Sequence, residues 1–335
     1  MYRSFWYLPL ILILFFGATS SGFEPEVPEG FPPVVYPEDN TFTADRYELG
    51  RKLFYDPILS ADSSISCASC HLPELAFSDQ VALSPGIYGR PGVRNAPSLA
   101  NVAYHPYFLR EGSVPTLEQQ VLVPIQEENE MAHNIVAIAS AMERDSSYVA
   151  MSISAYNRPP DAFVITHALA TFERTLLSGN SRYDQLMRQE EGAAFGQLER
   201  QGMELFFSDR TNCSVCHGGF NFTDYRFANN GLDTSYADIG RMRFTGKQED
   251  LSLFKVPSLR NIALTAPYMH DGSIATLEEV VHHYNTGGKA HPHRDPLIRP
   301  LHLSSEEEQA IVAFLKALSD PDFVSSAKAT VWRKN

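Results

Sequence analysis

Basic residues are scarce in this sequence, and their scarcity limits the kinds of partner it can bind. The 335 residues contain 27 Lys and Arg against 40 Asp and Glu, for a net charge of −13 and an isoelectric point near 5.3. This charge argues against nucleic acid or an anionic membrane as a partner, and it suits a basic or weakly charged protein. The alternative is that the acidic surface only keeps the protein soluble.

Long apolar runs are also missing, with one exception near the start of the chain. The run at residues 8–16 follows Arg3 and precedes the small residues at positions 17–21. The pattern predicts a secretory signal peptide at residues 1–22, because its apolar part is too short to span a membrane comfortably. An uncleaved anchor is the alternative, and the lack of a cysteine after the run excludes a lipoprotein. We therefore expect export to the periplasm and no membrane span after signal cleavage.

Cysteine is limited to 4 residues, and two short motifs use all of them. In each motif two thiols three positions apart can add to the vinyl groups of one porphyrin, and the next histidine can bind its iron. A four-thiolate zinc site and a thioredoxin-like redox pair are the alternatives, but neither requires that histidine. The sequence thus predicts two covalent c-type haems with His71 and His217 as proximal ligands. The motifs are Cys67-Ala68-Ser69-Cys70-His71 and Cys213-Ser214-Val215-Cys216-His217.

The chain resembles itself, which indicates a duplicated unit. Amphipathic helices are expected at residues 44–56 and 199–209, each shortly before a cysteine motif. A shift of 160 residues then aligns residues 97–118 with residues 257–278. Other helices are expected at 161–177, 181–189 and 304–318, and strand signals are few.

The expected fold class is mainly α, with two tandem class I cytochrome c-like domains that each bind one covalent c-type haem. The signal is followed by a proline-rich extended arm. The expected boundaries are 23–43 for the arm, 44–185 for the N-terminal haem domain, 186–325 for the C-terminal haem domain and 326–335 for a tail.

The two halves differ where a side chain would face the iron from the distal side. The second half has a helix with His282, His283 and Tyr284, any of which can turn toward an iron, and Met269 is a weaker rival. The residue 160 positions before Tyr284 is Pro124, whose side chain has no donor atom. The sequence therefore predicts one saturated haem, which transfers electrons, and one open haem, which can bind peroxide or oxygen.

Several motifs together resemble the bacterial di-haem cytochrome c peroxidase/MauG family, over essentially the whole mature chain. Besides the cysteine motifs they are Arg94-Asn95-Ala96-Pro97, Leu117-Glu118-x-Gln120 with Pro124, Glu130-Met131, and residues 256–261 running into Pro267-Tyr268-Met269-His270-Asp271-Gly272. The resemblance implies that the N-terminal haem is the peroxidatic site and that the C-terminal haem relays electrons. It also implies a calcium ion between the haems, bound by the Asn95 side chain and the backbone carbonyls of Thr265 and Pro267.

The same resemblance assigns the distal pocket. It implies that Gln120 orients peroxide and that Glu130 is the acid/base, because a carboxylate can carry a proton between the two peroxide oxygens. The alternative for Glu130 is a solvated place in the acidic run at residues 127–130. The haem environment is expected to include Arg110, Pro124 and His270.

Three departures from the family pattern change the expected chemistry. The loop at residues 86–92 has Ile87 where classical members have a distal histidine, so the open haem is expected to react without prior reduction. Tyr284 replaces an axial methionine, as in the MauG branch, and a phenolate lowers the haem potential. The family's tryptophan between the haems is replaced by Arg110, which puts the coupling of the irons in doubt and suits pairing with haem propionates.

Three functions follow from these expectations. The first is an exported peroxidase that reduces hydrogen peroxide with electrons from a small donor protein, a cytochrome c or a cupredoxin. The second is a MauG-like enzyme that oxidises residues of a partner protein, which Tyr284 favours. The third is a pure electron carrier, which requires both irons to be capped and conflicts with Pro124. A homodimer is compatible with each of them.

Overall fold

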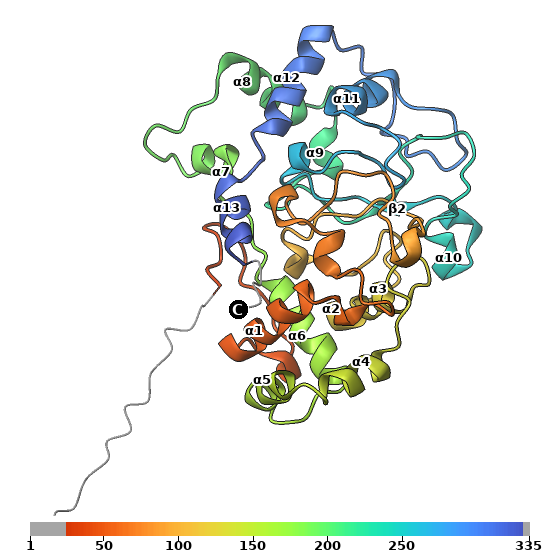
Figure 1. Ribbon diagram of the computed structural model, residues 1–335. Helices are drawn as coiled ribbons and strands as arrows, with labels where there is room; N and C mark the ends of the chain where they lie inside the picture. The colour runs from red at the N-terminus through yellow and green to blue at the C-terminus, as the bar shows by residue number, and fades with distance from the viewer. Residues whose placement is uncertain (1–24, 331–335) are drawn as a thin grey trace, which may run out of the picture.

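A pair of crossing helices forms the centre of each half of the structure. The computed structural model describes residues 25–330, which are mainly helical, as the sequence predicts. In the N-terminal half α1 (Ala44–Tyr55) crosses α6 (Ala162–Arg174), and in the C-terminal half α8 (Gln197–Phe206) crosses α12 (Ser305–Lys316). Figure 1 shows the first pair at the bottom of the molecule and the second at the top.

Each crossing requires a glycine. A Cβ atom on Gly50 would lie 1.9 Å from the backbone oxygen of Ala168, and one on Gly202 would lie 1.8 Å from that of Ala310. No side chain tolerates such distances, so only glycine lets the two backbones approach this closely. The two halves thus repeat the same kind of helix contact, which agrees with the duplication seen in the sequence.

The remaining elements are short and are joined by turns and 3-10 segments. Those of the N-terminal half are α2 (Leu117–Gln120), α3 (Leu122–Gln126), α4 (Ile135–Met142) and α5 (Ser146–Tyr156). Those that follow are α7 (Arg182–Met187), α9 (Cys213–Cys216), α10 (Met242–Thr245), α11 (Leu277–Thr286) and α13 (Pro321–Ala329). Within residues 25–330 the only sheet is the antiparallel pair of β1 (Phe227–Ala228) and β2 (Phe254–Lys255).

Side-chain caps determine where three of the predicted helices begin. Asp161, Ser181 and Ser304 each accept a hydrogen bond from a backbone N–H in the first turn of α6, α7 and α12. Such caps satisfy N–H groups that have no partner within the helix. The helices therefore start next to these residues, and each ends two or three residues before its predicted end.

The two halves have separate hydrophobic cores, but the last helix does not follow this division. Each core contains three fully or almost fully buried phenylalanines. They are Phe54, Phe77 and Phe172 in the first core, and Phe206, Phe222 and Phe314 in the second. Helix α13 follows the second half in sequence, yet its Phe323 and Ala327 pack in the first core. The expected division at residue 325 falls inside this helix, so the chain returns to its first half before it ends.

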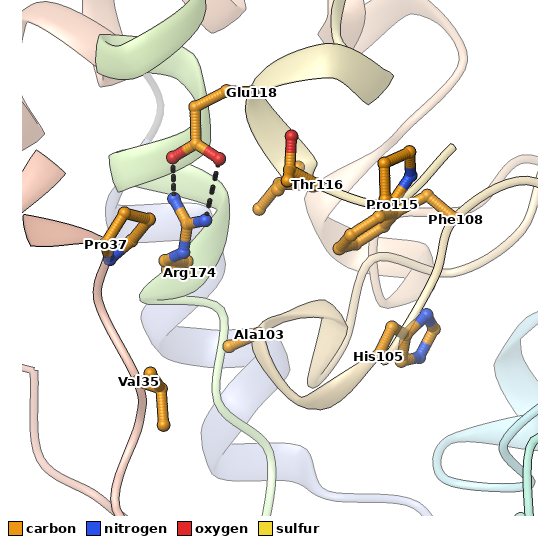
Figure 2. Close-up of a pocket in the computed structure, with 10 residues that line it drawn as sticks. Val35, Pro37, Ala103, His105, Phe108, Pro115, Thr116, Glu118 and Arg174 are labelled. Carbon is orange, nitrogen blue, oxygen red and sulfur yellow. Dashed lines mark hydrogen bonds and ion pairs between the residues drawn. The ribbon is translucent and has the colours of Figure 1, made fainter. Parts of the chain in front are cut away.

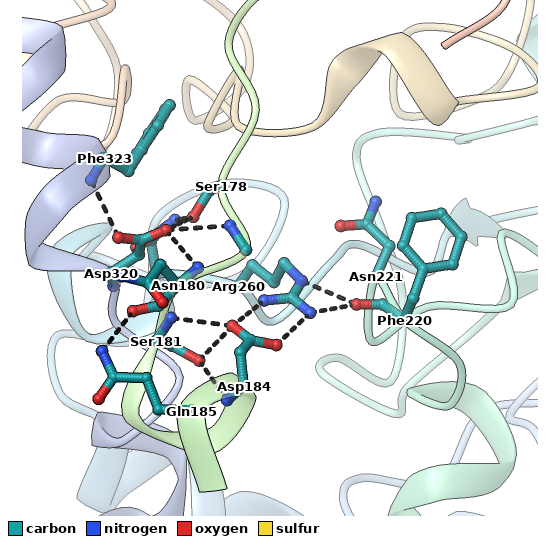
Figure 3. Close-up of polar contacts among 12 residues, drawn as sticks. Ser178, Asn180, Ser181, Asp184, Gln185, Phe220, Asn221, Arg260, Asp320 and Phe323 are labelled. Atoms are coloured by element: carbon teal, nitrogen blue, oxygen red, sulfur yellow. Dashed lines mark hydrogen bonds and ion pairs between the residues drawn. The ribbon is translucent and has the colours of Figure 1, made fainter. Parts of the chain in front are cut away.

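A buried polar junction joins the halves (Figure 3). The Asp320 carboxylate accepts hydrogen bonds from the Ser178 hydroxyl (3.1 Å) and from the two backbone N–H groups that follow it. Beside it, Arg260 and Asp184 form an ion pair with two hydrogen bonds of 2.8 and 2.9 Å. Because both carboxylates are satisfied by donors, the junction can be buried without an unsatisfied carboxylate.

The duplication is visible in this junction as a pair of asparagines. Asn101 and Asn261, which the shift of 160 residues aligns, both have a left-handed backbone with φ of 60°. Both also bind the same residue: Asn101 Nδ2 donates to the Ser178 carbonyl (2.8 Å) and Asn261 Nδ2 to the Ser178 hydroxyl (2.9 Å). The short linker between the halves is therefore held by one equivalent residue from each.

Two expectations concern the membrane. The predicted signal peptide lies outside the described residues. Across residues 25–330 no helix is long and apolar enough to cross a membrane.

Candidate haem centres

Both histidines of the cysteine motifs are prepared to bind iron. His71 Nδ1 donates a hydrogen bond to the Phe77 carbonyl (2.8 Å), and His217 Nδ1 donates to the Phe222 carbonyl (3.2 Å). Burial lowers the pKa of both imidazoles, which keeps them neutral. With the proton fixed at Nδ1, the Nε2 lone pair is left for a metal.

The N-terminal motif opens into a cavity. Cys67, Cys70 and His71 line it together with Gln120, Pro124 and Glu130 from α2, α3 and the turn that follows. The four cysteines of the chain are free, so no disulfide competes with thioether formation. The cavity thus brings the predicted attachment, proximal and distal residues of the first haem to one place.

Glu130 is not a solvated member of the acidic run. It is partly buried in the cavity wall, and its pKa is raised by burial and by the nearby charge of Glu127. Glu128, two residues earlier, is exposed. A carboxyl group that takes up protons more readily than an exposed glutamate is suited to proton transfer.

Gln120 is positioned through its neighbour Glu118. The Glu118 carboxylate forms two hydrogen bonds with Arg174 of α6 (2.5 and 2.9 Å) and accepts one from Asn40 of the arm (2.7 Å). Figure 2 shows this ion pair at the edge of a second cavity, between the arm and the loop that contains His105. The pair fixes α2 against α6, and with it the residue that reaches the haem cavity.

In the loop at residues 86–92, the position of the classical distal histidine is occupied by Ile87, whose side chain has no atom that can bind iron. The N–H of Ile87 donates to the Glu130 carbonyl (2.9 Å), and the Ile87 side chain is 1% exposed. A Cβ atom on Gly86 would lie 2.0 Å from the Asn129 carbonyl oxygen, so the loop packs directly against the Glu130 turn. Tyr88, in contrast, is 70% exposed and faces away from the core.

In the C-terminal half the rival ligands lie in different environments. Asn230 Nδ2 donates to the Met269 sulfur (3.1 Å) and to the Tyr284 hydroxyl (3.4 Å). Burial, together with the charges of Cys216 and Cys213, raises the pKa of Tyr284.

The two histidines before Tyr284 are engaged elsewhere. The His282 side chain is 66% exposed and contacts Glu308, while His283 Nε2 donates to the Asn230 carbonyl (3.0 Å). Of the three candidate side chains on this helix, Tyr284 is therefore the one with the most deeply buried polar group, and it shares the Asn230 amide with Met269.

The residues expected to hold calcium are only partly arranged for it. Asn95 N–H donates to the His270 carbonyl (2.9 Å), which brings the segment containing Thr265 and Pro267 toward Asn95. The Asn95 side-chain oxygen, however, accepts a hydrogen bond from Arg110 (3.1 Å). No group of three His, Cys, Asp or Glu side chains suited to a metal ion occurs in the described part of the chain. The donor set does not fit calcium while Arg110 holds this oxygen.

Glu173 is a cavity residue that the sequence analysis missed. It lies on α6, is 5% exposed, and has a side-chain oxygen without a hydrogen-bond partner. Burial raises its pKa to about 8. The available signal was its position four residues after Leu169 and eight after Ile165, which puts an acid on the apolar face of the helix.

The comparisons with known proteins agree with this arrangement. Residues 44–192 match the family of di-haem cytochrome c peroxidases. The methylamine utilization protein MauG of Methylorubrum extorquens is 35% identical over 295 residues, which cover 87% of this chain and 82% of MauG. The cytochrome-c peroxidase IdrP1 of Denitromonas iodatirespirans is 34% identical over 325 residues, with coverages of 86% and 85%.

A solved structure extends the likeness to the fold. The crystal structure of a MauG-like protein associated with microbial copper homeostasis superposes with a TM-score of 0.86 at 34% identity, covering 93% of this chain and 100% of that one. The likeness spans both halves of the molecule. The chain belongs to the di-haem cytochrome c peroxidase/MauG family.

Proposed function

We propose that this protein is an exported peroxidase that reduces hydrogen peroxide at its N-terminal haem, with electrons relayed through its C-terminal haem. One observation carries the proposal: Gln120, Pro124 and Glu130 line the same cavity as His71. By the family resemblance, Pro124 and the buried Ile87 stand at the positions from which a sixth ligand would come. Relatives named cytochrome-c peroxidase support the reaction class.

The residues of the N-terminal cavity have different proposed roles in the reaction. When bound, the haem supplies an iron that exchanges electrons with peroxide. His71 holds the iron through Nε2, because its Nδ1 proton is committed to the Phe77 carbonyl. Gln120 orients peroxide by hydrogen bonding. Glu130 would carry a proton from one peroxide oxygen to the other, which leaves as water, and its raised pKa favours this exchange.

The C-terminal site is assigned to electron relay. His217 and Tyr284 are the proposed axial ligands, and a tyrosine ligand stabilises ferric iron and lowers the potential. Two covalent haems c are thus the proposed cofactors, attached through Cys67 and Cys70 and through Cys213 and Cys216. The electron donor is a small redox protein such as a cytochrome c or a cupredoxin.

The location and the domain boundaries are part of the same proposal. A signal peptide at residues 1–22 directs the chain to the periplasm, where covalent haem attachment takes place. The arm at 23–43 precedes haem domains at 44–185 and 186–325. A homodimer is compatible with this proposal but adds nothing to the site.

A second candidate function is oxidation of residues in a partner protein. Tyr284 favours it, since this residue type marks the MauG branch, and the relative named MauG supports it. Arg110 weakens it, because the position between the haems lacks the tryptophan that would couple them.

Stopped-flow absorption of the fully ferric protein tests the proposal. Mixing with one equivalent of hydrogen peroxide should change the Soret band rapidly without any reductant. A spectrum that stays constant until one electron is added would mean that a ligand caps the first haem, and the proposal would fail. Steady-state oxidation of reduced cytochrome c then distinguishes the peroxidase from the protein-modifying enzyme.

A further inference from the structure

A guanidinium group lies between the two haem sites. Arg110 lines the N-terminal cavity, and its backbone oxygen accepts a hydrogen bond (2.7 Å) from Lys255 of β2 in the C-terminal half. Arginine side chains remain protonated in proteins, so this group is cationic at neutral pH. A fixed positive charge is therefore built into the contact between the halves.

The hydrogen-bond acceptors of Arg110 both belong to Asn95. The guanidinium donates to the Asn95 carbonyl oxygen (2.7 and 3.2 Å) and to its side-chain oxygen (3.1 Å). Within residues 25–330 no carboxylate lies within ion-pair distance of Arg110. The neighbouring Arg94 differs, because Glu111 and Asp238 both pair with it. Arg110 thus donates hydrogen bonds to neutral groups only, although the charges of Asp271 and Asp238 also act on it.

The hydrogen bond from Arg110 occupies the Asn95 side-chain oxygen, which is the atom expected to bind calcium. Calcium takes six to eight oxygen ligands, about 2.3–2.6 Å away. Asn95 is the one residue of the expected set that offers a side-chain oxygen, since Thr265 and Pro267 offer carbonyls. A calcium ion on that oxygen would stand beside the guanidinium, and like charges repel strongly at such a distance.

We infer that Arg110 takes the place of the inter-haem calcium in this protein. The guanidinium supplies the positive charge at the junction and holds Asn95, whose N–H binds the His270 carbonyl of the other half (2.9 Å). Its fork of donors suits this task, because it can reach two oxygens of one residue at once. The unmatched charge is then available to a carboxylate of the bound haem.

The inference rests on the proposed haem sites but not on the proposed reaction. It concerns the resting protein, so metal content and stability test it without turnover. A failed peroxidase assay would leave it standing, and a calcium-loaded protein would overturn it whatever the activity.

The experiment uses the full holoprotein, its Arg110→Gln variant and a matched Arg243→Gln control. Arg243 also lines the cavity but is exposed and makes no contact with Asn95. After dialysis against excess calcium and then buffer, elemental analysis should find no stoichiometric calcium in the wild type or in the control. EGTA should leave their melting temperatures and Soret bands unchanged.

The Arg110→Gln variant should behave differently. It should melt at a lower temperature than the wild type, and added calcium chloride should restore part of the loss. If this variant does not fold, Arg110→Lys keeps the charge and should fold without binding calcium. One tightly held calcium per wild-type chain, or a calcium-bound Arg110→Lys variant, would overturn the inference. So would an Arg110→Gln variant whose stability ignores calcium.

Discussion

The two halves of the molecule repeat several turns and caps, and they differ in the helix that follows the second of these caps. Equivalent residues form these turns and caps: Asn101 and Asn261, Gly112 and Gly272, Thr116 and Thr276. After the first cap the chain forms the short helices α2 and α3, with Pro124 in the second of them. After the second cap α11 runs unbroken to Thr286 and includes Tyr284. The duplicated unit therefore has proline in one half at the position where the other half has a tyrosine, which is the difference that the proposed open and capped irons require.

The difference between the two halves should be lost most completely if the first haem site gains a side-chain ligand for its iron. Ile87→His places an imidazole in the loop against the Glu130 turn, where the buried Ile87 side chain now lies. We expect the ferric variant to lose its rapid Soret response to peroxide until one electron is supplied. Stopped-flow absorption measures this. Tyr88→His is the control, because that neighbouring side chain is exposed and should leave the response intact.

Removing the acid/base of the open site should have the next largest effect. Glu130→Gln keeps the shape of the side chain but cannot carry the proton, so peroxide reduction should slow by about 10²–10⁴-fold. The rate of the Soret change reports the loss. Glu128→Gln removes a carboxylate from the same turn at an exposed position and should have little effect. Equal rates in the two variants would disprove the role of Glu130.

Substitutions at the two helix crossings test whether close backbone packing contributes equally to the stability of both halves. Gly50→Ala and Gly202→Ala put a methyl group against a backbone oxygen at nearly the same distance. Each should lower the free energy of unfolding by about 1–3 kcal/mol, the usual cost of overpacking. Urea unfolding compares them with Gln201→Ala, an exposed change next to Gly202. A large difference between the two glycine variants would show that the halves are not equivalent.

The last effect concerns pH, is small only when counted per pH unit, and belongs to the N-terminal cavity. The pKa of Glu173 is about 8 in the folded protein against an ordinary 4.5. Between these values the folded carboxyl keeps a proton that the unfolded one has lost, so stability falls as pH rises, by at most about 1.4 kcal/mol per pH unit.

Glu173→Gln should remove this dependence. Urea unfolding at pH 5 and pH 8 would give a smaller difference for the variant than for the wild type. Glu204→Gln, at an exposed position of α8, is the control and should keep the wild-type dependence. An unchanged difference in Glu173→Gln would show that this carboxyl does not titrate as described.

The features that could be predicted from the sequence are those encoded by neighbouring residues or by family motifs. The helices with strong caps, such as α6 after Asp161, begin where predicted because the cap is encoded beside them. The cavity around Cys67 and His71 likewise gathers Gln120 and Glu130, which the family resemblance named.

The remaining features depend on contacts between distant segments. Arg94 pairs with Asp238, 144 residues away, and α13 packs in the first core rather than the second. The hydrogen bonds from Arg110 to Asn95 span only 15 residues, but they follow from how two turns face each other. No periodicity or spacing in the sequence reports such arrangements.

The return of α13 to the first core sets an order of assembly. Phe323 packs against Phe77 with ring centroids 5.9 Å apart, and the carbonyl of Phe77 is the group that holds the His71 ring. The packing behind the proposed first iron ligand is therefore incomplete until nearly the last described residues of the chain have been synthesised.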